Sequence, residues 1–196
     1  MIALKVSITN KDALILVDIQ NDFCVGSLAV PNACDIIKYA NSYIEIFKKN
    51  IRPIFATRDW HPKNHSSFKE FGGIWPIHCI QNTDGSMFYK DLRLPNDTLI
   101  ISKGTNPDKD AYSGFDGTDL HDKLKNLNIN RLFIGGLATD YCVKATILDA
   151  LALDYTTFFL SDASKAVNLK PDDEALSINE MLKAGAILID LNDLIQ

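Results

Sequence analysis

The chain has 196 residues, a length that suits one domain able to bury roughly 70% of the surface exposed by its unfolded form. Hydrophobic residues make up 46% of the chain and charged residues 23%, which are ordinary proportions for a water-soluble globular protein. The net charge is −5 and no run of five Lys or Arg residues occurs. We therefore expect neither nucleic acid nor an anionic membrane as a partner.

The N-terminal stretch MIALKVSITNKDALILVDIQ contains no basic region followed by a long apolar block, so we expect no signal peptide. No apolar stretch approaches the ~20 residues of a membrane span. The four cysteines, which have no C-x-x-C spacing, are Cys24, Cys34, Cys79 and Cys142. In a chain of this length without an export signal, we expect reduced thiols and a cytoplasmic location.

Short apolar runs alternate with amphipathic patterns along the chain. The expected strands are residues 13–19, 53–57, 98–102, 131–137, 155–160 and 186–190. They show little polar alternation, which is typical of strands buried on both faces. Helices are expected over 36–47, 120–127 and 175–182, and another should begin near Thr139. This order predicts a single α/β domain over 1–196, with helices on both faces of a mostly parallel sheet of about six strands.

Three chemically active side chains fall at the ends of predicted strands. Asp18 ends the first strand, Lys103 follows the third, and Cys142 lies in the first turn of the helix after the fourth. The carboxyl ends of parallel strands share one edge, where ligands bind. A helix N-terminus favours a thiolate and offers N–H groups to an oxyanion. A buried apolar cysteine and a structural Asp–Lys ion pair are the alternatives, but the three residues together favour a catalytic set.

The connection after the second strand, residues 59–97, is unusually long and contains three of the four histidines. Asp59 and His61 form a short chelating pair, and His65 or His78 could complete a site for a divalent metal. Surface histidines in a loop are the alternative. Aromatic side chains cluster near the same edge and line either a ligand pocket or the core; they are Phe23, Trp60, Trp75 and Tyr112.

Five segments, DIQNDF, RDWHPKNH, WPIHC, KGTNPDKDAYSGFDG and GLATDYCVKATILDAL, occur in this order between about residues 13 and 190. Together they resemble the bacterial nicotinamidases of the isochorismatase-like cysteine hydrolase superfamily. The resemblance implies the three-layer α/β/α isochorismatase-like hydrolase fold. It also implies a catalytic triad of Asp18, Lys103 and Cys142.

The same resemblance implies further site residues. The metal ligands would be Asp59, His61 and His78, with His65 as a further ligand or as a partner of the ligands. The ion would be one divalent metal, zinc first, with iron and manganese also compatible with nitrogen and oxygen ligands. The N–H groups of Ala138 and Cys142 would form an oxyanion hole, next to a cis peptide between Leu137 and Ala138. The pyridine ring would be surrounded by Phe23, Trp75 and Tyr112.

The implied activity is hydrolysis of nicotinamide to nicotinate and ammonia through a cysteine thioester, as a step of NAD salvage. Some relatives acting on carbamoyl or ureido amides share the Asp-Lys-Cys set but generally lack the Asp-x-His metal cluster. Isochorismatases proper lack the nucleophilic cysteine. A non-catalytic metal-binding module on this fold is a third alternative. A homo-oligomer and activity on pyrazinamide stay open.

Overall fold

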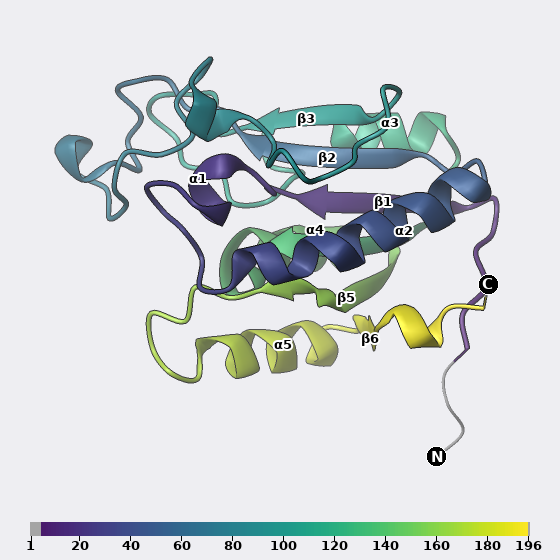
Figure 1. The fold of residues 1–196 in the computed structure, drawn as a ribbon. Helices are drawn as coiled ribbons and strands as arrows, with labels where there is room; N and C mark the ends of the chain where they lie inside the picture. The colour runs from purple at the N-terminus through teal and green to yellow at the C-terminus, as the bar shows by residue number, and fades with distance from the viewer. Residues whose placement is uncertain (1–4, 196) are drawn as a thin grey trace.

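A six-stranded sheet, all of whose neighbouring strands are parallel, forms the middle layer of the computed structural model, which describes residues 5–195 (Figure 1). Its strands are β1 (Asp12–Val17), β2 (Ile54–Asp59), β3 (Leu99–Lys103), β4 (Arg131–Leu137), β5 (Thr156–Lys165) and β6 (Ile187–Ile189). Their spatial order is β3-β2-β1-β4-β5-β6. The chain therefore begins in the middle of the sheet and builds outward in both directions, which confirms the predicted parallel α/β architecture.

The helices cover both faces of this sheet. They are α1 (Asn21–Cys24), α2 (Ile37–Lys49), α3 (Leu120–Asn126), α4 (Lys144–Ala152) and α5 (Asp173–Lys183). Figure 1 shows α2 lying across one face, where Phe47 packs with Leu14 and Leu16 of β1. On the other face, Ile15 of β1 joins a cluster that includes Ile147 of α4 and buried residues of α3 and α5. Successive β1 side chains enter opposite cores, so the strand reads as a continuous apolar run.

Most element boundaries shift by one or two residues from the predicted ones, and three of the differences lie near the functional edge. β1 ends at Val17 rather than at residue 19, because Asp18 adopts a left-handed backbone with φ of 50°. The helix expected from Thr139 begins as a π-helical turn, Thr139–Val143, and becomes α-helical only at Lys144. β5 continues five residues past the predicted end at 160, because its pairing with β4 resumes beyond a register shift.

The carboxyl ends of the strands define the functional edge. Figure 1 shows the connections that follow β1, β2 and β3 gathered at this edge, on the left of the view. Within residues 5–195, no helix has the length and apolar character required to cross a bilayer. The predicted domain of 1–196 also takes in residues 1–4 and 196, which lie outside the described part, and its extent stays a prediction.

Candidate active site

A buried lysine lies at the centre of the functional edge. The Nζ atom of Lys103, at the end of β3, is 2.9 Å from Asp18 Oδ2 and also forms an ion pair with Asp59. It lies 3.4 Å from the Cys142 sulfur and donates a 3.1 Å hydrogen bond to the Ala111 carbonyl. The predicted Asp18, Lys103 and Cys142 are therefore brought together, although 39 residues separate the lysine from the cysteine.

The carboxylate of Asp18 lies next to the thiol. The left-handed backbone at Asp18 follows β1 directly, and Thr57 Oγ1 donates a 2.6 Å hydrogen bond to Asp18 Oδ1. Burial raises the pKa of Asp18, and the opposing positive charge of Lys103 does not cancel this effect. A carboxylate with a raised pKa is a stronger base than an ordinary aspartate. Asp18 is therefore suited to take a proton from Cys142.

The thiol of Cys142 differs from the expectation that a helix N-terminus would favour the thiolate. Burial raises its pKa well above the ordinary thiol value, and the nearby Asp18 and Asp59 charges add to this, against the opposing charge of Lys103. Burial thus favours the neutral form of the Cys142 thiol.

The backbone around Ala138 leads directly into the turn that carries Cys142. The Leu137–Ala138 peptide is cis, as the resemblance implied. The N–H groups of Tyr141 and Val143 donate to the Ala138 carbonyl at 3.0 and 3.1 Å. Within residues 5–195, no backbone carbonyl outside the turn accepts from the N–H of Ala138 or Cys142. The oxyanion hole expected from the N–H groups of Ala138 and Cys142 stays a prediction.

Next to the triad, three side chains converge as a metal site would require. Ligand atoms of Asp59, His61 and His78 lie within 4.8 Å of one another, and all three residues are buried. His61 Nδ1 lies 2.9 Å from the Gly104 carbonyl, and His78 Nδ1 lies 2.8 Å from the Pro76 carbonyl. A carbonyl only accepts, so each Nδ1 carries the proton and each Nε2 keeps its lone pair for a metal. This donor set fits a divalent ion such as zinc.

Charge in this cluster is governed by Asp59. Burial raises the pKa of Asp59, but the Lys103 charge and the two histidines outweigh it and leave the pKa below its usual range. Burial lowers the pKa of His78. Burial lowers the pKa of His61, but the Asp59 carboxylate, 3.5 Å from Nε2, outweighs it and raises the pKa. Asp59 is thus a carboxylate that Lys103 contacts through Oδ1 and the histidines approach through Oδ2.

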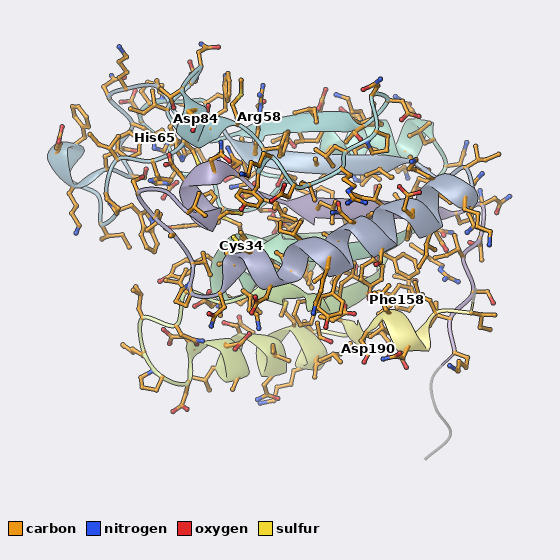
Figure 2. The ribbon with its side chains drawn as sticks, viewed as in Figure 1. Cys34, Arg58, His65, Asp84, Phe158 and Asp190 are labelled. Carbon is orange, nitrogen blue, oxygen red and sulfur yellow. The ribbon has the colours of Figure 1, made fainter. Side chains whose placement is uncertain are left out.

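His65 lies beside the converging set. Its ring packs against that of His61 with centroids 4.1 Å apart, in the group of connections beyond the strand ends (Figure 2). His65 Nδ1 is 2.7 Å from Ser67 Oγ and Nε2 is 3.2 Å from the Lys109 carbonyl. Both nitrogens therefore contact protein atoms. Direct ligation of a metal by His65 stays a prediction.

A cavity of about 30 Å³ opens beside the sulfur. Its lining includes all three aromatics that the resemblance assigned to the ring site, and the full set is Phe23, Leu28, Val30, Asp59, Trp75, His78, Tyr112, Ala138, Tyr141, Cys142 and Val167. Trp75 Nε1 donates a 2.9 Å hydrogen bond to the Tyr112 hydroxyl. Trp60 does not line this cavity. The Arg58 guanidinium carbon lies over the Trp60 ring, 3.6 Å from the ring centre.

Sequence reasoning missed several residues that shape the site. The most connected is Gln20, a fully buried side chain whose oxygen accepts from the Asp59 N–H at 2.8 Å. Its amide nitrogen donates to the Asp59 and Ser86 carbonyls at 2.8 and 2.9 Å. Gln20 thereby fixes the backbone of Asp59. A neutral glutamine gives no chemical signal in a sequence, and only its place in DIQNDF could have drawn attention to it.

Comparisons with known proteins agree with this geometry. The model of the isochorismatase domain family matches residues 12–193. The chain belongs to the isochorismatase family. It is 39% identical to the nicotinamidase of Escherichia coli K12, over 92% of this chain and 95% of that protein.

Two solved structures extend the likeness. One is the pyrazinamidase of Pyrococcus horikoshii in complex with zinc. The match has a TM-score of 0.89 and 49% identity, and it covers 92% of the present chain and 99% of the pyrazinamidase chain. The other is PnC1 of L. infantum in complex with nicotinate, with a TM-score of 0.91 and 31% identity over 98% and 99% of the two chains. These matches confirm the predicted isochorismatase-like hydrolase fold.

Proposed function

We propose that this protein is a nicotinamidase, which hydrolyses nicotinamide to nicotinate and ammonia. One observation carries the proposal: the Asp18, Lys103 and Cys142 side chains adjoin the Asp59, His61 and His78 set. Cys142, Asp59 and His78 of these two groups line one small cavity together with aromatic rings. Acyl transfer needs a nucleophile, a base and charge stabilisation, and an aromatic amide needs a flat apolar pocket. The relative from Escherichia coli, named a nicotinamidase, supports the same substrate.

Acylation begins when Asp18 takes the proton of the Cys142 thiol. The sulfur attacks the carboxamide carbon, and the N–H groups of Ala138 and Cys142 receive the negative oxygen. Lys103 stabilises the ionised sulfur from 3.4 Å. Asp18 then gives its proton to the leaving nitrogen, the C–N bond breaks, and ammonia departs from a thioester on Cys142.

Deacylation uses the same carboxylate. Asp18 takes a proton from water, whose oxygen attacks the thioester carbon. The C–S bond breaks, the proton returns to the Cys142 sulfur, and the product carboxylic acid releases its own proton to solvent and leaves as nicotinate. Asp18 thus serves as base and acid in each half of the reaction, for which its raised pKa is suited.

One divalent ion would be held by Asp59 and by the Nε2 atoms of His61 and His78, with zinc favoured by the complex seen in the Pyrococcus horikoshii relative. Such an ion would supply a Lewis-acid position for the pyridine nitrogen, by which these residues would orient the ring. His78 lines the same cavity as Cys142 and Asp59, so a ring held there can present its carboxamide to the sulfur. His65 would support His61 or complete the ligand set.

A direct test measures ammonia release by the purified, zinc-loaded protein from nicotinamide and from a ureido substrate such as N-carbamoylsarcosine. We expect rapid turnover of nicotinamide and little of the ureido compound, with Cys142→Ala protein as the background. Preference for the ureido substrate would assign the carbamoyl-amide alternative. Release from neither substrate would overturn the amidohydrolase assignment.

A further inference from the structure

A buried carboxylate outside the proposed catalytic set, that of Asp140, lies two residues before the nucleophile. Asp140 is 6% exposed, and the proposed chemistry gives it no role. Its Oδ1 accepts a 2.9 Å hydrogen bond from the Val167 N–H, and its Oδ2 accepts a 2.8 Å bond from the Asn168 N–H. Both carboxylate oxygens therefore bind the backbone of the connection between β5 and α5. Charge-assisted bonds of this kind are stronger than neutral ones.

That connection forms part of the pocket. Val167 lines the cavity beside Cys142 and packs against the buried cluster on the α2 face. Asn168, which adopts a left-handed backbone with φ of 53°, accepts from the Glu174 N–H at 2.8 Å and so joins the connection to the first turn of α5. The position of Val167 is thus set by the bond of its own N–H and by the bonds of Asn168 after it.

A neighbouring residue makes a parallel connection. Thr139 Oγ1 lies 2.7 Å from Ser164 Oγ, and Ser164 also donates to the Gly136 carbonyl at 3.0 Å. Through Thr139 and Asp140, the turn that carries the nucleophile is bonded to the end of β5 and to the segment after it. The sulfur and the Val167 wall of the pocket therefore hold a fixed separation.

We propose that Asp140 is a positioning residue that sets the width of the ring pocket between Cys142 and Val167 and thereby limits which ring carboxamides fit. The proposal deepens the proposed function and rests on it for the substrate class. Without the Asp140 carboxylate, the N–H groups of Val167 and Asn168 lose the acceptors of two part-buried hydrogen bonds, and the connection can rearrange toward water. The Val167 wall then moves away from the sulfur. Nicotinamide loses contact, and a bulkier ring gains room.

The kinetic test compares Asp140→Ala and Asp140→Asn with wild type, on nicotinamide and on nicotinamides methylated at each free ring carbon. Since one methyl in a tight pocket is worth roughly 10-fold or more, we expect the preference for nicotinamide over the most excluded methyl derivative to fall by about that factor in Asp140→Ala. The loss of kcat/KM for nicotinamide should come mainly from KM. Asp140→Asn retains one acceptor oxygen, so its preference for nicotinamide should lie between those of the wild type and Asp140→Ala.

Asp173→Asn is the matched control, because Asp173 Oδ2 accepts a 2.8 Å bond from the Lys170 N–H in the same connection but does not line the pocket. It should keep the wild-type preference. An equal loss of kcat/KM for nicotinamide and for every methyl derivative in the Asp140 variants, or no loss at all, would overturn the proposal.

Amide hydrogen exchange provides a readout that needs no turnover. In Asp140→Ala, exchange at Val167 and Asn168 should accelerate by at least about 10-fold, while amides of α2 stay at the wild-type rate. Unchanged exchange at these two amides would show that Asp140 does not hold the segment. If the wild type failed to hydrolyse nicotinamide, the proposed function would fall while this measurement still tested the positioning. If Asp140→Ala did not fold, the substrate preference and the amide exchange would both be measured on Asp140→Asn.

Discussion

Lys103 forms a buried ion pair with Asp59 as well as with Asp18, so one ammonium is shared by the metal-type cluster and the triad. All three side chains are essentially removed from water. The lysine neutralises part of the charge of two buried carboxylates while it faces the Cys142 sulfur at 3.4 Å. Its removal should therefore affect stability as well as catalysis.

Lys103→Met should destabilise the metal-free protein by about 3–5 kcal/mol at neutral pH, because two buried carboxylates lose their counter-ion. Their folded-state pKa values would rise above the unfolded values, so the folded state would bind protons more tightly. The penalty should then shrink as pH falls toward the ordinary carboxyl pKa of about 4. Urea denaturation of the wild type and Lys103→Met between neutral pH and about pH 4 measures this loss of stability.

The control for that variant is Lys123→Met, which removes an exposed ion pair with Asp119. Exposed pairs contribute roughly 0–1 kcal/mol, so its unfolding should stay close to wild type. A Lys103→Met protein as stable at neutral pH as the Lys123→Met protein would contradict the shared-lysine argument.

Gly104→Ala should weaken zinc binding by about 10-fold or more, because Gly104 fixes a metal-facing histidine. Gly104 has φ of +60°, and an added Cβ would lie 2.4 Å from His61 Cε1. His61 would have to move away from Asp59 and His78. Competition with a chromophoric chelator measures the affinity.

Gly117→Ala separates the clash from the backbone strain, since Gly117 has a similar φ of +68° and no atom within 4 Å of an added Cβ. It should cost about 1 kcal/mol of stability and keep the zinc affinity. Equal affinity in the two alanine variants would mean that the Gly104 contact does not hold His61.

Cys142→Ala should lower kcat for nicotinamide by at least about 10³-fold, since no covalent intermediate can form. The small buried side chain leaves the fold and the zinc content unchanged. Single-turnover kinetics and metal analysis check both points. A variant that retained more than a few per cent of the wild-type rate would exclude the thioester route.

Activity should fall on acidification at a pH above the ordinary aspartate pKa of 3.8, because Asp18 must be ionised and burial raises its pKa. Thr57→Val should move this acid limb of kcat/KM to higher pH, since the Thr57 hydrogen bond lowers the Asp18 pKa by favouring the charged form. The pH profiles of the two proteins give the comparison. A limb that moved to lower pH would assign the titration to another group.

Benzamide should lose on the order of 10²-fold or more in kcat/KM relative to nicotinamide, because it has the same shape without the ring nitrogen. Removal of the metal should abolish nicotinamide turnover, and His61→Ala should do the same. Steady-state kinetics on holo and chelator-treated protein measure these effects. Equal rates on benzamide and nicotinamide would reject the role given to the ring nitrogen.

Local sequence patterns were enough to predict the strands and the sheet type. Buried parallel strands need apolar residues on both faces, so runs such as residues 131–137 are readable without any partner. The edge rule then placed Asp18, Lys103 and Cys142 near one another, because the carboxyl ends of parallel strands converge. The same rule brought Asp59 and His61 to that edge.

What the tertiary structure decided is the environment of each group. The sequence placed Cys142 in an activating helix turn, yet burial raises its pKa, and no local pattern encodes burial by distant elements. The sharing of Lys103 between Asp18 and Asp59 and the bonds from Asp140 to Val167 likewise join residues that the sequence keeps far apart. The sequence alone determined which chemical groups reach the edge of the sheet. Their charge states and partners depend on desolvation and on distances across the fold, which only the packed structure sets.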